Sequence, residues 1–283
     1  MRGVSLLVIG NATYMHYAAN LMCSIKYYNP KIKINMITEN HLVETIPKHF
    51  MLWDFLTIID ESDSYHNGKL SPGLAKVSLY KYLFDTTGWK ETIYLDVDAI
   101  AIRDISGLFE CSGYFHVQKD AKHWADDKEI SEHFGVKKNI HGVNTSYQYI
   151  KKCDESEKLF DLWRDLYVNS SYPMEKQLNS WFKNQPDELY LTATLSKLGI
   201  KNPFPDFSES PIYFRSRFAL GERKAVSEIT EQHWLIGYYG DQRFNHKSLA
   251  KLYDKLAQKH AMELLKVHNI YKYHYLINNK HKY

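Results

Sequence analysis

The stretch ETIYLDVDAIAIRD, residues 91–104, indicates the fold. Its apolar residues are typical of a buried strand, and two aspartates, Asp96 and Asp98, follow with one valine between them. Side chains alternate along a strand, so both carboxylates would share one face and repel each other unless a cation lies with them. Mg²⁺ and Mn²⁺ take carboxylate oxygens together with substrate phosphates. The stretch predicts a metal or nucleotide site at a strand end; the alternative is two solvated loop acids.

The first hundred residues predict alternating strands and helices. Apolar runs favour strands at 4–10, 33–38, 55–59 and 92–96, while helical periodicity favours helices at 15–28 and 73–85. A strand, a helix and a second strand within about thirty-five residues form a βαβ unit, which requires a parallel sheet. In such sheets ligands bind beyond the carboxyl ends of the strands. The acidic pair occupies such a position.

The rest of the chain is less regular. We expect strands at 114–117 and 142–150, helices at 155–168, 187–198 and 246–266, and an irregular proline-rich loop at 201–211. At 283 residues and 44% hydrophobic, the chain can bury one large core. We therefore expect a single α/β domain over 1–245 with a basic helical C-terminal extension over 246–283.

Cysteine usage and apolar runs indicate the compartment. The three cysteines, Cys23, Cys111 and Cys153, are odd in number and widely spaced, so no disulfide framework is expected. The apolar run near the N-terminus is too short for a membrane span, and no other stretch is long enough. We expect a cytoplasmic protein without a transmembrane segment.

The positive charge gathers at one end of the chain. Residues 251–283 hold seven lysines and two acids, a net charge of +5, whereas the whole chain carries +3. Such a segment could contact an anionic surface, such as the inner membrane face, or nucleic acid. The alternative is a solvated helix with a frayed terminus.

Several signatures of other enzyme classes do not occur. The chain has no Gly-x-Gly-x-x-Gly after its first strand, no Gly-x-x-x-x-Gly-Lys loop and no Gly-x-Ser-x-Gly elbow. These absences disfavour dinucleotide-dependent enzymes, P-loop ATPases and serine hydrolases. A nucleotide fold without phosphate-cradling glycines can instead bind phosphates through a metal held by acids.

Ordered motifs resemble those of a known family. VIGNATYMHYAANLMCSI is similar to a first strand and helix that contact a nucleotide base, which implicates Asn11 and Tyr14. LAKVSLYKYLF is similar to a helix whose lysine, here Lys76, approaches the diphosphate and sugar, and YLDVDAIAIRDISGLF to a metal-binding strand. Together they resemble the GT-A fold glycosyltransferases, and within these the retaining glycogenin and galactosyltransferase-like group, family 8. The resemblance implies a Rossmann-like mixed central sheet flanked by helices.

Three later stretches complete the resemblance. GVNTSYQYI implicates Asn144 in contacting the donor sugar, although Ser146 stands where glycine is usual. PDELYL implicates Asp187 and Glu188 beneath the sugar, and EQHWLIGYYG implicates His233 as a metal ligand beside Asp96 and Asp98. The family's lysine after this histidine is absent, with two tyrosines nearby, which puts the subfamily in doubt.

The resemblance implies a metal-dependent glycosyltransferase. It would use Mn²⁺ or Mg²⁺ and a nucleotide diphosphate sugar, such as a UDP-sugar, and preserve the anomeric configuration. The acceptor could be a glycan, a lipid-linked glycan or a modified nucleic acid. Two alternatives remain open: a sugar-nucleotide nucleotidyltransferase, whose usual Gly-rich basic N-terminal loop is missing here, and a non-catalytic sugar- or nucleic-acid-binding module that stacks its tyrosines on bases.

Overall fold

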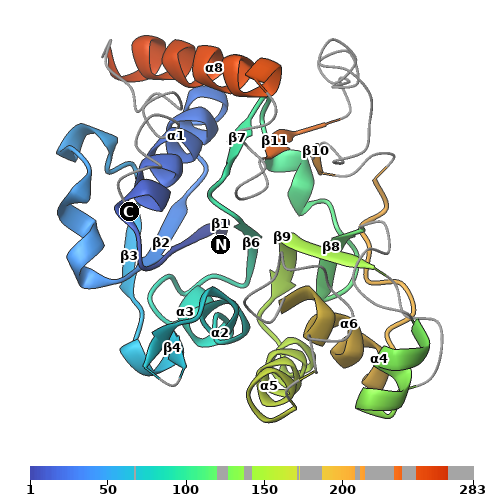
Figure 1. Cartoon of the computed structure of the whole chain (residues 1–283). Coiled ribbons are helices and arrows are strands. Elements are labelled where there is room, and N and C mark those ends of the chain that lie inside the picture. Colours follow the sequence, from blue (N-terminus) through green and yellow to red (C-terminus); the bar gives the residue numbers. More distant parts are fainter. Residues whose placement is uncertain are drawn as a thin grey trace.

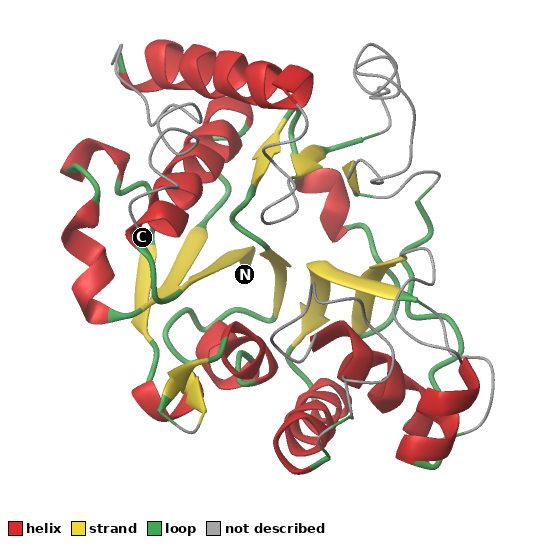
Figure 2. Ribbon diagram, in the orientation of Figure 1, coloured by secondary structure: helices red, strands yellow, loops and turns green. Residues whose placement is uncertain are grey.

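A central sheet lies between two layers of helices in the computed structural model (Figures 1 and 2). The structure describes residues 1–66, 68–119, 127–136, 142–170, 172, 187–207, 211–213, 233–237 and 247–266. The helices are α1 Ala12–Tyr28, α2 Pro72–Val77, α3 Tyr80–Phe84, α4 Asp127–Phe134, α5 Asp154–Asn169, α6 Asp187–Lys197 and α8 Lys247–Leu265. Four short 3-10 helices are η1 Asn40–Thr45, η2 Lys48–Phe50, η3 Glu61–Asp63 and η4 Ser106–Phe109.

The main sheet has six strands in the order β3-β2-β1-β6-β9-β8. β3, β2, β1 and β6 are parallel, whereas β9 is antiparallel to both β6 and β8. The sheet is therefore mixed, as the resemblance implies, and only its first four strands form the parallel sheet that the βαβ pattern predicts. Its strands are β1 Arg2–Val8, β2 Ile34–Thr38, β3 Phe55–Ile58, β6 Glu91–Leu95, β8 Phe115–Lys119 and β9 Val143–Lys151.

Two smaller sheets complete the described part of the chain. One has the order β10-β11-β7 and begins just after the acidic pair, because β7 directly follows Asp98. The other is a two-stranded hairpin of β4 and β5. Their strands are β4 Tyr65–His66, β5 Lys69–Leu70, β7 Ala99–Ala101, β10 Ile212–Tyr213 and β11 Leu235–Gly237.

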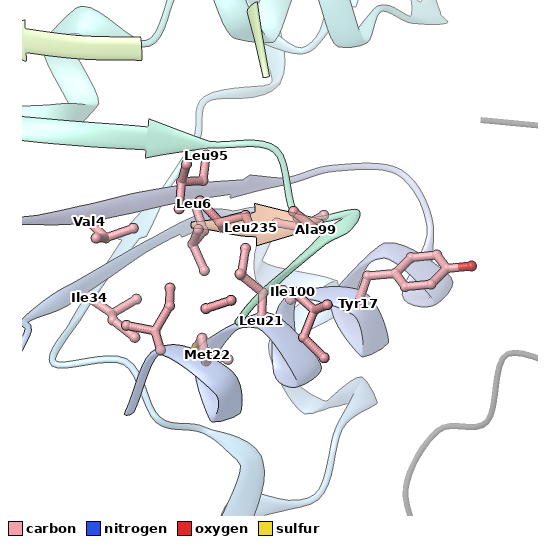
Figure 3. Packing of buried hydrophobic residues seen from close by; sticks show 14 of the residues in the cluster. Val4, Leu6, Tyr17, Leu21, Met22, Ile34, Leu95, Ala99, Ile100 and Leu235 are labelled. Carbon is pink, nitrogen blue, oxygen red and sulfur yellow. The ribbon is translucent and has the colours of Figure 1, made fainter. Parts of the chain in front are cut away.

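Each face of the main sheet carries its own apolar core. Alternate residues of β1 divide between them: Leu6 belongs to the core under α1 and α8, and Leu7 to the core under α2, α3, α5 and α6. Figure 3 shows the first core, where Leu21 of α1 lies against the strands. Both leucines are buried, and burying such a side chain contributes about 1.5–3 kcal/mol.

Helix α8 packs directly against α1. Its residues Tyr253, Ala257 and Ala261 are buried in the core shared with α1, and small side chains at 257 and 261 lie one helical turn apart. The expected extension over 246–283 thus begins with a helix that packs on α1 and β7. Within the described residues, no helix is long and apolar enough to cross a membrane.

One expected helix is divided. The pattern at 73–85 predicts a continuous helix, but α2 ends at Val77 and α3 begins at Tyr80. Ser78 leaves the helical conformation (φ −91°, ψ 2°), and its side-chain hydroxyl accepts a hydrogen bond from Arg164 Nε of α5 at 3.1 Å. The break between α2 and α3 therefore occurs where Ser78 contacts Arg164, a residue far along the chain.

Candidate functional site

Four polar side chains meet at the carboxyl end of β6. The Lys76 Nζ lies 2.9 Å from Asp96 Oδ1 and 3.6 Å from Asp187 Oδ2. It also donates to Thr145 Oγ1 at 3.2 Å, and the Thr145 hydroxyl donates to Asp187 Oδ2 at 2.6 Å. Three residues that the resemblance implicates, Lys76, Asp96 and Asp187, are thus brought together, with Thr145 joining them.

Four different elements position this cluster. Ser71 caps α2 by accepting from Leu74 N at 3.3 Å, and Pro72 occupies the first helical position, where its missing N–H costs nothing. This short helix carries Lys76. Asp96 directly follows β6, and its backbone N–H donates to Ser146 O of β9 at 2.9 Å. The adjacent strand β9 carries Thr145, and α6 begins with Asp187.

Sequence reasoning overlooked two aromatic residues that hold the cluster. The Tyr94 hydroxyl donates to Asp96 Oδ1 at 2.6 Å, and Trp163 Nε1 donates to the backbone carbonyl of Asp187 at 3.0 Å. Tyr94 and Asp96 are two residues apart, so strand alternation could have indicated their contact. No sequence signal links Trp163 to Asp187, because α5 and α6 meet only in the folded chain.

Burial and charge shift two pKa values in the cluster. Burial alone would lower the pKa of Lys76, but the carboxylates of Asp187 and Asp96 outweigh it and hold that pKa well above its ordinary value. Burial raises the pKa of Glu188 well above its ordinary value, and the Asp187 carboxylate raises it further. Lys76 therefore remains a cation, while its surroundings make ionisation of Glu188 less favourable than in water.

The residues implicated in base binding lie along the same edge of the sheet. Asn11 caps α1 by accepting from Thr13 N at 2.8 Å, three residues after the carboxyl end of β1. Tyr14, one helical turn on, is 39% exposed and therefore has an accessible ring face. The backbone N–H of Gly10 donates to Glu39, which follows β2. The carboxyl ends of β1, β2 and β6 therefore form one continuous polar edge.

Asn144 is buried in β9 beside the cluster. Its Oδ1 accepts from the backbone N–H of Ser146 at 2.9 Å, and Ser146 O in turn accepts from the backbone N–H of Asp96. Asn144 thus supports the strand segment next to Asp96. Serine at position 146, where the family usually has glycine, is accommodated in this buried strand.

The predicted metal ligands are not all brought together. β11 runs antiparallel to β7 with Gly237 opposite Ala99, directly after Asp98. β11 begins at Leu235, opposite Ala101 at the end of β7, so His233 lies two residues before β11, at the end of this pairing that is distant from Asp98. His233 is therefore separated from the two aspartates. Within the described residues, no three His, Cys, Asp or Glu side chains gather as a metal site.

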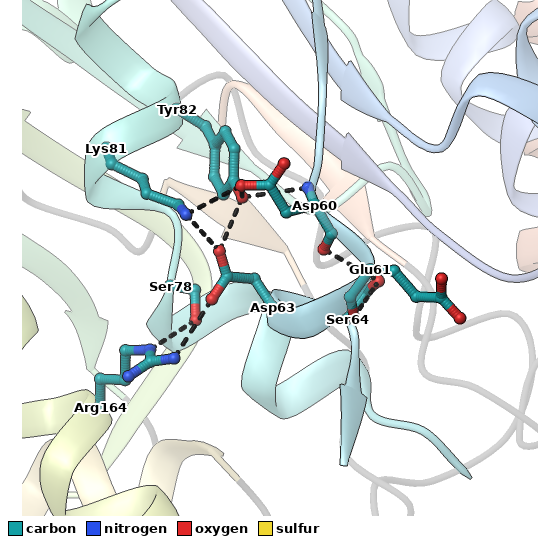
Figure 4. A network of polar contacts seen from close by, with 8 residues as sticks. All are labelled: Asp60, Glu61, Asp63, Ser64, Ser78, Lys81, Tyr82 and Arg164. Atoms are coloured by element: carbon teal, nitrogen blue, oxygen red, sulfur yellow. Dashed lines mark hydrogen bonds and ion pairs between the residues drawn. The ribbon is translucent and has the colours of Figure 1, made fainter. Parts of the chain in front are cut away.

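A second polar network joins η3, α5 and the break between α2 and α3 (Figure 4). Asp63, whose side chain is 5% exposed, accepts from Tyr82 OH at 2.7 Å and pairs with Lys81 Nζ at 2.6 Å and Arg164 Nη2 at 3.2 Å. Arg164 also donates to Ser78, two residues after Lys76. The network fastens η3 and α5 to the break between α2 and α3.

The arrangement is that of the GT-A glycosyltransferase fold. A parallel half-sheet leads into an acidic strand end, and an antiparallel strand returns beside it. Among solved structures, the galactosyltransferase LgtC, in complex with donor and acceptor sugar analogues, superposes with a TM-score of 0.56 and 12% identity, covering 92% of this chain and 96% of that one.

Two further glycosyltransferases have a similar fold. The bifunctional enzyme WbbM superposes with a TM-score of 0.57 and 12% identity, over 89% of this chain and 49% of that one. GlyE of Streptococcus pneumoniae superposes with a TM-score of 0.54 and 14% identity, over 96% of this chain and 66% of that one. No protein-family profile and no curated protein sequence matches the chain.

Proposed function

We propose that the chain is a metal-dependent glycosyltransferase that moves a hexosyl group from a UDP-sugar to an acceptor. The observation that carries the proposal is the contact of Lys76 with Asp96 and Asp187 at the carboxyl edge of a GT-A sheet. In open α/β sheets this edge is where ligands bind. We place the enzyme in the retaining, glycogenin and galactosyltransferase-like group on the strength of its motifs.

Lys76 would neutralise the donor diphosphate. Its ammonium is a cation held by two carboxylates, and its side chain is only 12% exposed. A buried cation interacts strongly with developing phosphate charge because little water screens it. When the glycosidic bond to the diphosphate breaks, Lys76 would stabilise the negative charge that remains on the leaving group.

The residues present fit a divalent cation through two carboxylates. Asp96, Asp187 and Glu188 surround one lysine, so negative charge exceeds positive charge even when Glu188 is protonated. Asp96 and Asp98 would hold Mn²⁺ or Mg²⁺, with waters and donor phosphates as the remaining ligands. Such a metal, when bound, supplies Lewis-acid stabilisation of the diphosphate. His233 is left out of this proposal because of its position.

Asp187 and Glu188 would contact the donor sugar. The Thr145 hydroxyl and Lys76 orient the Asp187 carboxylate, which could stabilise positive charge at the anomeric carbon. A protonated Glu188 would donate a hydrogen bond to a sugar hydroxyl. Analysis of the product by NMR tests the retaining outcome, and an inverted anomeric centre would contradict it.

Other residues near the carboxyl ends of the strands would bind the nucleoside and position the donor sugar. Tyr14 offers an exposed ring to the uracil base, Asn11 lies one turn before it, and Asn144 would approach the sugar from β9. We propose a cytoplasmic enzyme whose acceptor is a glycan, a lipid-linked glycan or a modified nucleic acid, with the basic segment 251–283 contacting anionic surfaces. Residues 267–283 of that segment lie outside the described part.

Donor hydrolysis provides the test. The protein is incubated with Mn²⁺ and a panel of nucleotide sugars, and release of nucleoside diphosphate is measured. We expect slow hydrolysis of one UDP-sugar, loss of this activity in Asp98→Asn, and retention in Asp104→Asn, because Asp104 instead accepts from Ser106 and Asn29. Equal activity of the two variants would refute the metal assignment, and turnover that requires pyrophosphate would indicate a nucleotidyltransferase.

A further inference from the structure

A cavity of about 820 Å³ lies at the end of the main sheet that is opposite the candidate active site. It is formed where β1 and β6 begin and β9 ends, and its size is within the range of small-molecule sites. The lining residues are Met1, Arg2, Lys90, Glu91, Lys151, Lys152 and Cys153. Four of these side chains are basic and one is acidic.

The single carboxylate that lines the cavity already has partners. Glu91 Oε2 accepts from Tyr149 OH at 2.6 Å, and Glu91 Oε1 lies 3.6 Å from Arg2 Nη1. None of the described carboxylates pairs with Lys90, Lys151 or Lys152. The acids in the first turn of α5 follow Cys153 in sequence but do not line the cavity. The cavity therefore has an excess of positive charge.

Backbone contacts fix the positions of the three lysine residues relative to one another. Lys151 lies opposite Glu91 in the β6–β9 ladder. Lys152 N donates to Lys90 O at 2.8 Å, which ties the ends of the two strands together. Lys90 N donates to Met1 O at 2.9 Å, which adds β1 to the same frame. The backbone therefore holds these residues in a fixed arrangement around the cavity.

The cavity is separate from the candidate active site. β6 carries Glu91 at one end, and Asp96 follows the other, so five strand positions or about 17 Å separate them. A ligand bound among the lysines would not touch Lys76 or the two aspartates.

We propose that this cavity binds a compact ligand bearing a phosphate or diphosphate group. Ammonium groups form short, charge-assisted hydrogen bonds to phosphate oxygens, and three lysine residues here line one hollow, with the Lys152 ammonium lying 6.0 Å from the centre of the Phe84 ring. A membrane surface would favour cations that protrude from a convex face, whereas these surround a concave one. The ligand chemistry is therefore that of an oxyanion with several oxygens, such as phosphate, pyrophosphate or a sugar phosphate.

Calorimetric titration of the full chain with inorganic phosphate and with pyrophosphate, without Mn²⁺ or nucleotide sugar, tests the proposal. We expect saturable binding that Lys90→Glu weakens at least about tenfold. Lys48→Glu, the same charge change at an exposed residue outside the cavity, should leave the affinity unchanged within about twofold, apart from long-range charge. Lys76→Ala should also retain the binding, which distinguishes this site from the donor site.

A second readout uses Cys153, which lines the cavity. Its rate of labelling by a thiol reagent should fall severalfold in the presence of saturating pyrophosphate, and this protection should be lost in Lys90→Glu. Melting curves of Lys90→Glu should match those of the wild type, because Lys90 is exposed. Absence of binding, or equal weakening by Lys48→Glu, would overturn the proposal. Binding to vesicles of anionic lipid without binding to phosphate or pyrophosphate would likewise overturn it and indicate a membrane surface.

Discussion

Asp63→Asn should destabilise the protein by about 2–4 kcal/mol. The buried carboxylate accepts a hydrogen bond from Tyr82, whose side chain is itself buried, and such bonds to charged groups contribute about 1.5–3 kcal/mol. The ion pairs with Lys81 and Arg164 involve half-exposed cations, so each adds only about 0.2–1 kcal/mol. An amide keeps the shape of the carboxylate but loses its charge.

Asp60→Asn is the matched control for this prediction. Asp60 Oδ2 lies 3.0 Å from the same Tyr82 hydroxyl oxygen and pairs with the same Lys81, but its side chain is 66% exposed against 5% for Asp63. Water screens an exposed pair, so we expect Asp60→Asn to cost clearly less stability than Asp63→Asn. Urea denaturation of both variants at pH 7 measures the difference. Equal costs would refute the reasoning that burial sets the strength of this network.

The effect of Asp63 should depend on pH in one direction. Burial raises the pKa of Asp63, but hydrogen bonds from Lys81 and Tyr82 outweigh it and lower that pKa below its ordinary value of 3.8. A lowered folded-state pKa stabilises the fold above the unfolded-state value, and this stabilisation disappears as pH falls through the folded-state value. The stability difference between the wild type and Asp63→Asn should therefore shrink below about pH 3.8.

Three further predictions concern buried titratable groups and α8. Glu188→Gln should raise the melting temperature near pH 8 and lose this advantage as pH falls toward 4.5, because the raised pKa of Glu188 makes its ionisation costly in the folded state. Burial lowers the pKa of His260 to about 4, so stability should fall as pH decreases from 6.5 to 4, and urea titrations of His260→Phe should show a flatter profile. Deleting 247–283 should abolish cooperative melting because Tyr253 and Ala257 are buried, and cooperative melting of the shortened chain would instead support a purely tethering role for this segment.

Local sequence patterns predicted the helices and strands that depend on contacts between residues close together in the sequence. The βαβ unit, the strand before Asp96 and the helix that begins at Asp187 all have clear periodicity or boundary signals, and the structure has them. The motif resemblance further indicated that Lys76 and Asp187 serve one site. The structure adds the contact itself, which joins residues more than a hundred positions apart.

Other features depend on long-range packing that local patterns do not record. The break at Ser78 accompanies its hydrogen bond with Arg164. β7 and β11 have three residues each, too few for a periodicity signal, and their register separates His233 from Asp98. A prediction of metal ligands from the order of motifs alone could not take the register of β7 and β11 into account.

The cluster around Lys76 also joins segments that are far apart in the chain. Lys76 and Asp96 come from the parallel half of the sheet, whereas Thr145 and Asp187 arrive with the returning strand and the helix behind it. Contacts across such long chain separations form late, because loop closure must precede them. A chain with only one folded half would lack the complete cluster. A ligand that needs both halves would also stabilise only the fully folded chain, so its binding would report completed folding.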